Sequence, residues 1–132
     1  MVDGHPAGRR SWPSKFRDAF RGVARGVRYE TSFLIHFFLA AAVVVVAAIV
    51  GATLVEWCLL LVCIFTVLTV ELFNTAIERL AKVVHQGEHP EIRDCLDIAS
   101  GAVLTAAIGS ALVGVLILVP RALAFFLRLM ES

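Results

Sequence analysis

Three long apolar runs, separated by polar segments, dominate the hydropathy pattern of the chain. They occupy, in chain order, about residues 33–50, 54–76 and 98–119. A helix of about 18 to 20 residues, rising about 1.5 Å per residue, crosses a hydrocarbon core of about 30 Å. The pattern therefore predicts an all-α membrane protein with three transmembrane helices.

A basic, amphipathic segment precedes the first apolar run. Ser14 is a plausible N-cap, and from there to residue 29 apolar side chains recur at i, i+3, i+4 spacing beside a stripe of arginines. The apolar positions are Phe16, Ala19, Phe20, Val23 and Val27, and the basic ones are Arg17, Arg21, Arg25 and Arg28. This pattern predicts an N-terminal helix over residues 14–29 that lies on an anionic membrane surface. The alternative is a solvated arm that only sets topology.

The two ends of the chain carry less information. Residues 1–13 contain His, Pro, Gly and Arg without periodicity and indicate a flexible basic tail. Residues 120–132 follow the last apolar run after Pro120 and form a C-terminal tail whose conformation the pattern does not determine. The membrane domain is therefore expected over residues 14–119.

Positive charge gives the orientation. Lys and Arg are frequent before the first span and occur between the second and third, whereas the turn between the first two spans has none. Because basic loops stay in the cytoplasm, the N-terminus and the second loop are expected to be cytoplasmic. Arg121 and Arg128 lie on the opposite side and run mildly against the rule.

Composition agrees with the hydropathy pattern. The chain has 132 residues, 59% of them hydrophobic, and a mean hydropathy of +0.85. Such a chain is too apolar for an ordinary soluble domain. The net charge of +1 says little, and no nucleic-acid partner is expected.

One face of the second span is polar at its cytoplasmic end. Glu71, Asn74 and Glu78 are spaced i, i+3, i+7, which confines them to an arc of about 60° on a helix. A carboxylate near the end of a membrane helix is costly, so such residues usually face a bundle interior or a water-filled cavity and mark a functional site. The site is expected where lipid and water meet.

Other polar groups lie at the same predicted interface. Glu30 precedes the first span, Asp97 and Ser100 open the third, and Glu88 and His89 lie in the loop before it. Neighbouring carboxylates favour Mg²⁺, which proteins hold with one or two carboxylates plus phosphate oxygens. A further carboxylate could take a proton from an alcohol. The chain contains no phosphate loop of the GxxxxGK[ST] kind, no zinc motif and no Ser/His/Asp elbow.

Two segments carry a family resemblance. ELFNTAIE at residues 71–78 and DIASGAVL at residues 97–104 resemble the prokaryotic diacylglycerol kinase family, which includes undecaprenol kinases of Gram-positive bacteria. FRDAFRG at residues 16–22 and ETSF at residues 30–33 fit in the same order and spacing. The resemblance covers about residues 14–119.

The resemblance implies a homotrimer of three-span subunits in the bacterial inner membrane. Each subunit would transfer the ATP γ-phosphate to a membrane alcohol, either diacylglycerol, giving phosphatidic acid, or undecaprenol, giving undecaprenyl phosphate. It makes Glu71 the general base, and Glu30 and Glu78 the ligands of Mg²⁺ with the nucleotide. Positions around the nucleotide match Asn74, Glu88, His89 and Asp97, and the lipid acceptor is expected beside Glu71, Phe33 and Ser100.

A non-catalytic function is the alternative to the kinase. The same carboxylates could line the cavity of a three-span oligomeric channel or of an accessory membrane subunit. The Glu88-His89 loop and the cytosolic extension of the second span favour the kinase, because a pore has no need of a nucleotide platform.

The chain departs from the family pattern at three positions. Lys82 stands where the family commonly has Asp, Leu96 where it has Lys, and Leu34 where it often has Arg. Lys82 lies within about 20° of the Glu71 direction on a helix. We therefore expect Lys82 to bind the nucleotide by supplying the phosphate-facing cation that Leu96 cannot.

The first prediction tests this role of Lys82. Lys82→Ala should lower kinase turnover far more than Arg79→Ala does, because only the first change removes a cation from the face of Glu71. Turnover with saturating ATP measures both. Equal, small losses of turnover in the two variants would refute this role of Lys82.

Overall fold

The computed structural model describes residues 11–29 and 31–131, and this part of the chain is helical without strands. Its helices are α1 (Trp12–Tyr29), α2 (Thr31–Ile49), α3 (Leu54–Val84) and α4 (Pro90–Met130). In length and composition, α2, α3 and α4 are each able to cross a membrane. The predicted all-α class with three spans is confirmed.

A tight turn makes α2 and α3 antiparallel neighbours. Gly51 has φ 71°, a left-handed backbone conformation that glycine adopts without steric cost. Thr53 then caps α3: the Glu56 N–H donates to Thr53 Oγ1 at 3.4 Å, and the Thr53 N–H donates to Glu56 Oε2 at 2.7 Å. This reciprocal capping box fixes the start of α3.

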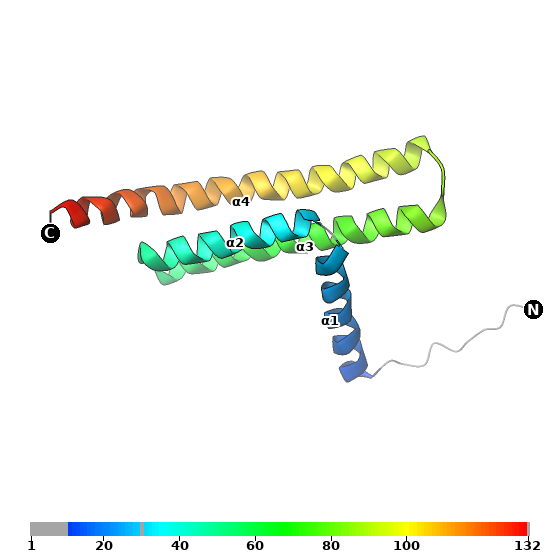
Figure 1. The fold of residues 1–132 in the computed structure, drawn as a ribbon, viewed down its shortest axis with the longest axis horizontal. Coiled ribbons are helices and arrows are strands. Elements are labelled where there is room, and N and C mark those ends of the chain that lie inside the picture. Colours follow the sequence, from blue (N-terminus) through cyan, green and yellow to red (C-terminus); the bar gives the residue numbers. More distant parts are fainter. Residues whose placement is uncertain (1–10, 30, 132) are drawn as a thin grey trace, which may run out of the picture.

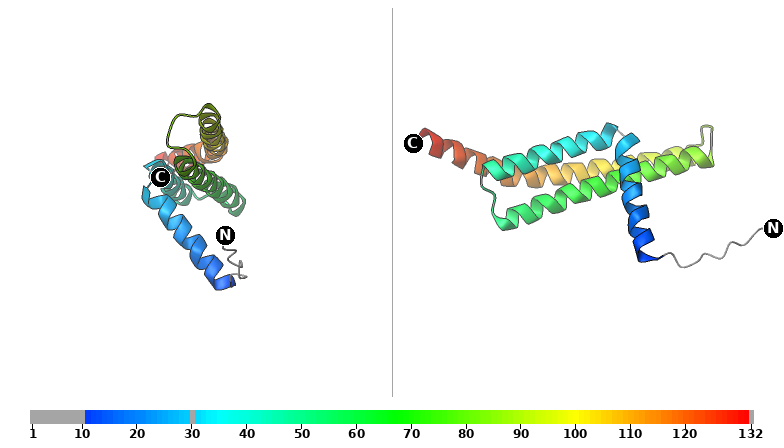
Figure 2. Two further views of the ribbon diagram at one scale, coloured as in Figure 1. Left: turned by 90° about the vertical axis from the view of Figure 1, so that its right-hand side faces the viewer. Right: turned by 60° about the horizontal axis from the view of Figure 1, so that its bottom comes forward.

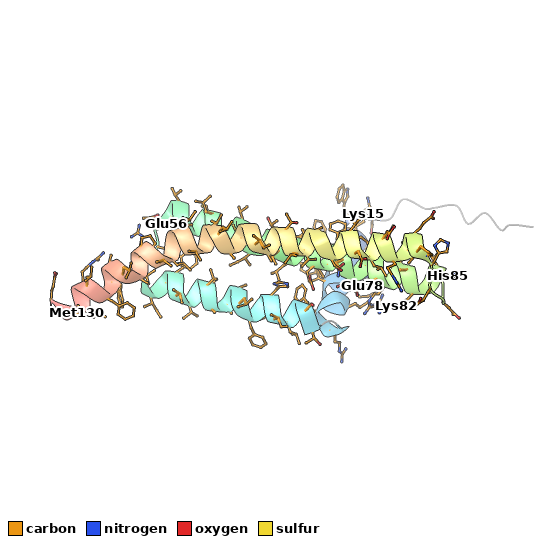
Figure 3. All side chains as sticks on the ribbon, turned by 90° about the horizontal axis from the view of Figure 1, so that it is seen from above. Lys15, Glu56, Glu78, Lys82, His85 and Met130 are labelled. Carbon is orange, nitrogen blue, oxygen red and sulfur yellow. The ribbon has the colours of Figure 1, made fainter. Side chains whose placement is uncertain are left out.

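The two paired helices differ in length. α2 has 19 residues and α3 has 31, so α3 continues for 31 − 19 = 12 residues beyond the start of α2. At about 1.5 Å per residue these lengths are about 28 Å and about 46 Å, and only the first matches a hydrocarbon core of about 30 Å. Figure 3 shows Glu56 near one end of α3 and Glu78, Lys82 and His85 toward the other. The surplus of α3 therefore extends into water, and Glu71 lies about where it begins.

α4 packs along α3 and continues past it. The Ser110 hydroxyl donates to the Cys63 carbonyl at 3.4 Å between the two helices. α4 passes through Pro120 without ending and reaches Met130, so the segment of unassigned conformation is helical as far as the structure describes it. Its last turns lie beyond the turn that joins α2 and α3 (Figure 1). Proline removes one backbone hydrogen bond from a helix, and the neighbouring Arg121 is anchored to that turn.

α1 crosses the three long helices steeply instead of running alongside them (Figures 1 and 2). It begins at Trp12, two residues before the predicted start, and the Ser14 hydroxyl donates to the Ser11 carbonyl at 2.8 Å. Ser14 is thus inside the helix and is not its N-cap. Gly26 is buried where α1 meets α3, and a Cβ added there would require the end of the Leu72 side chain to move. At this glycine, α1 comes into contact with the middle of α3.

An ion pair joins the first turn of α3 to the C-terminal part of α4. Arg121 contacts Glu56 twice, with Nη2 at 2.9 Å from Oε2 and Nε at 3.1 Å from Oε1, and its Nη1 donates to the Gly51 carbonyl at 3.3 Å. This forked contact neutralises one of the two arginines that run against the positive-inside pattern. It also ties α4 to the α2–α3 turn.

The second prediction concerns this tie. Arg121→Leu should lower the free energy of unfolding by about 1–2 kcal/mol, the lower range for hydrogen bonds to charged groups, because both side chains retain some exposure to solvent. Unfolding in mixed micelles, followed by circular dichroism, measures the loss. Arg128→Leu, an exposed arginine in the last turn of α4, is the matched control and should change stability by less than about 0.5 kcal/mol. Equal effects of the two variants would contradict the tie.

Candidate active site

Glu71 belongs to the buried stripe of α3. The buried positions of this helix are Leu60, Val67, Glu71 and Thr75, whose spacing places them on one face. The stripe is apolar in its first half and polar in its second. Glu71 is 3% exposed and Thr75 4%, so the carboxylate points into the helix bundle and away from lipid. The structure thus contains a buried acid at the level where α2 begins.

α2 faces this acid with two side chains. Phe33 is 4% exposed, and His36, one turn further along the same face, brings its Nε2 to 4.0 Å from Glu71 Oε2. The family resemblance places Phe33 beside the lipid acceptor, and the sequence favours an interfacial or inter-helix hydrogen-bonding role for His36 over that of a ligand. The distance is in ion-pair range and exceeds that of a hydrogen bond.

Asn74 and Glu78 are joined to each other. The Asn74 Nδ2 donates to Glu78 Oε1 at 2.8 Å, and both residues are half-buried. The Asn74 Oδ1 is buried and has no hydrogen-bond partner in the described residues. Since a buried acceptor without a partner is costly, this oxygen is suited to a donor or a cation that the structure does not contain.

Lys82 and the following loop lie further into water. Lys82 is exposed, one turn beyond Glu78 (Figure 3). In the loop, Arg93 Nη2 lies 3.4 Å from Glu88 Oε2, and the rings of His85 and His89 meet edge to face with centroids 5.6 Å apart. Within residues 31–131, no hydrogen bond or ion pair links this loop to the polar face of α3.

Asp97 and Ser100 are exposed on α4. The Ser100 hydroxyl donates to the Leu96 carbonyl at 3.0 Å within its own helix. The contact of Ser110 with Cys63 fixes the register of α3 and α4, and by that register Asp97 lies at about the level of Glu78. The two acids are therefore level along the bundle without a bond between them.

The structure brings together only part of the predicted cluster. Glu71 meets His36, and Asn74 meets Glu78, whereas Glu88, His89, Asp97 and Ser100 make their contacts elsewhere or are exposed. Glu30, predicted to hold Mg²⁺, lies outside the described residues. Among the described residues, no group of three or more His, Cys, Asp or Glu side chains could hold a metal ion.

An apolar groove reaches His36, the residue whose ring lies 4.0 Å from the Glu71 carboxylate. It has a volume of about 560 Å³, lies between α2, α3 and α4, and is lined from His36 to Val119 almost wholly by aliphatic side chains. Cys63 and Ser110 are the other lining residues that carry a hydrogen-bonding side chain. This apolar surface thus leads to His36, the neighbour of the buried acid.

Comparison with known proteins assigns the chain to a family. Residues 17–118 match the family model described as prokaryotic diacylglycerol kinase. The chain belongs to the prokaryotic diacylglycerol kinase family. It is 33% identical to an undecaprenol kinase of Bacillus subtilis (strain 168). The similarity extends over 106 residues, which cover 80% of this chain and 86% of that protein.

A second relative is a diacylglycerol kinase of Synechocystis sp. (strain ATCC 27184 / PCC 6803 / Kazusa). It is 34% identical over 106 residues, which is 80% of this chain but only 61% of that protein. No solved structure matches the chain. Family membership makes the chain a membrane lipid kinase, with an alcohol acceptor and a nucleotide phosphoryl donor. The buried acid and the whole polar face of α3 lie inside the matched region.

Sequence reasoning missed two features of this site. His36 carries a titratable ring one turn into an apolar span, and that position was the available signal. Gly26 was one of several glycines, and nothing local distinguished it as the point where α1 meets Leu72. Both depend on the register between helices.

Proposed function

We propose that this kinase uses ATP with Mg²⁺ to phosphorylate the hydroxyl of a membrane lipid, with Glu71 as the general base. The single observation that carries this proposal is a carboxylate that is 3% exposed and lies 4.0 Å from His36, which lines an apolar groove between the three long helices. A base in that position meets a lipid hydroxyl from one side and a cytosolic nucleotide from the other. A buried acid with no reaction to serve would be a pure cost in stability.

The reaction balances with one proton transfer and one phosphoryl transfer. Glu71 takes the proton of the lipid hydroxyl as its oxygen bonds to the γ-phosphorus. The bond from that phosphorus to the β,γ-bridging oxygen breaks, and ADP leaves with the bond's electron pair. Phosphoryl transfer depends mainly on positioning and charge neutralisation, so a small helical site is sufficient.

Glu78 and Glu30 are the proposed ligands of Mg²⁺. The fit rests on chemistry, because Mg²⁺ takes oxygen ligands and Asn74 Oδ1, beside the Glu78 carboxylate, is a buried oxygen without a partner in the described residues. When bound, Mg²⁺ supplies positive charge to the phosphates of the nucleotide. Asn74 holds the Glu78 carboxylate in one orientation by its 2.8 Å hydrogen bond.

The remaining predicted residues are assigned to the nucleotide and the lipid. Lys82 offers its exposed ammonium to the phosphates, one turn beyond Glu78, in place of the family's usual lysine at position 96. Glu88, His89 and Asp97 are exposed to water and accessible to a cytosolic nucleotide. Phe33 and Ser100 are assigned to the lipid acceptor, which is undecaprenol or diacylglycerol.

The assembly is proposed to be a homotrimer in the bacterial inner membrane with a cytoplasmic N-terminus. In a single copy, the most apolar stretch of α4 contains no buried residue, which leaves this helix free to pack against another subunit or lipid. α1 is proposed to lie on the cytoplasmic leaflet, because Phe16 and Phe20 are exposed on it beside its arginines. The kinase domain is then residues 14–119, with α4 continuing beyond it.

The third prediction tests the activity itself. The purified protein in detergent, given ATP labelled at the γ-phosphate and Mg²⁺, should transfer label to undecaprenol or diacylglycerol, and a competition between the two identifies the preferred acceptor. Glu71→Gln should reduce transfer at least about 10³-fold, because its amide cannot accept the proton. Glu91→Gln, an exposed acid outside the site, is the control. Label transfer that survives in Glu71→Gln would refute the base, and none from the unaltered protein would favour the channel or accessory subunit.

The fourth prediction concerns the orientation of Glu78. Asn74→Leu removes the hydrogen bond to Glu78, and the Mg²⁺ concentration for half-maximal activity should rise about tenfold, since such a bond to a charged group is worth about 1.5–3 kcal/mol. Thr66→Val, which removes a hydroxyl bonded only within α3, is the matched control and should leave that concentration unchanged. An unchanged Mg²⁺ requirement in Asn74→Leu would separate Asn74 from the metal.

A further inference from the structure

The Glu71 carboxylate has one ionic neighbour in the described residues. His36 Nε2 lies 4.0 Å from its Oε2, and the two side chains are 20% and 4% exposed. In that part of the chain, neither α1 nor α4 makes an ion pair with either group. The acid and the imidazole therefore form an isolated pair between α3 and α2.

A polar imidazole in this apolar groove is costly in free energy unless its ring nitrogens have hydrogen-bond partners. Aliphatic side chains dominate the groove that His36 lines, and a leucine would fill the same space without polar atoms. Burying a polar ring nitrogen without a hydrogen bond costs about 1–3 kcal/mol on the protein mutational scale. The Glu71 carboxylate can accept from Nε2, and a small side-chain movement closes 4.0 Å to hydrogen-bond length.

We propose that His36 is the positioning residue of Glu71: its ring donates to the carboxylate and holds it toward the end of the groove, where the lipid hydroxyl arrives. The inference rests on the proposed function, in which Glu71 is the base. His36 acts through Glu71 and not on the phosphoryl group. Its role is to hold one carboxylate oxygen so that the other is free to take the proton.

The Glu71 carboxylate needs a partner from another helix to be held in one position. A glutamate side chain has three rotatable bonds, and α3 itself provides Glu71 with no hydrogen-bond donor in the described residues. A partner on another helix restricts the carboxylate and couples its position to the packing of α2 on α3. A misplacement of about 1 Å in a catalytic group can cost about 10²-fold in rate.

The fifth prediction compares three substitutions of His36. His36→Leu should lower kcat about 10- to 100-fold and leave the KM of ATP and of the lipid within about twofold, because the base is misplaced while binding is intact. His36→Gln should restore kcat to within about fivefold of the unaltered enzyme, since its amide N–H can reach the place of Nε2. His36→Asn, one methylene shorter, should not.

Steady-state kinetics on the full chain, with thermal unfolding of each variant, measure these effects. Phe37→Leu, an exposed neighbour on α2, is the control and should keep kcat within about twofold. The Gln and Asn variants have the same chemistry and differ in reach, so their comparison holds even where His36→Leu fails to fold. Equal kcat for Gln and Asn, or a loss confined to the KM of the lipid, would overturn the role. An inactive unaltered protein would refute the proposed function instead.

Discussion

The placement of one ionisable group dominates the architecture. Glu71 is nearly inaccessible, in a helix whose first half is hydrophobic enough to lie in a bilayer. A carboxylate there is tolerated only with a partner, and α2 supplies His36 at 4.0 Å. The packing of α2 against α3 is thus what places His36 beside the Glu71 carboxylate.

The unequal lengths of the helices decide where this group lies. α2 has 19 residues, about enough to cross the hydrocarbon core, whereas α3 has 31. Because the α2–α3 turn is tight, the surplus of α3 is all at the other end. Glu71 is therefore at the rim, with Glu78 and Lys82 beyond it. At the opposite end, the ion pair of Arg121 with Glu56 anchors α4 to the turn, far from the rim.

The site divides into parts that differ in preorganisation. Asn74 and Glu78 are already bonded within α3, and Glu71 already faces His36. The loop residues Glu88 and His89 contact only their own neighbours and are exposed. This contrast suits a reaction between a substrate that stays in the bilayer and one that arrives from water, because only the second needs an open entrance.

The sequence by itself determined the three spans, their antiparallel order and the polar face of Glu71, Asn74 and Glu78. These follow from the local period of a helix and the thickness of a bilayer. Motif resemblance also indicated the family, which the comparison of residues 17–118 confirms. The conformation after Pro120 stayed open, because one lost hydrogen bond does not decide whether a helix ends.

Only the tertiary structure decided which distant side chains meet. His36 and Glu71 are 35 residues apart in the sequence (71 − 36 = 35) and lie on different helices. The period of a single helix relates residues three, four or seven apart, so it cannot predict this contact. Arg121 with Glu56 and Gly26 with Leu72 are likewise contacts between helices. A helical period fixes which face a residue occupies on its own helix. It does not fix the rotation and sliding of one helix against another, which packing, turns and ion pairs set together.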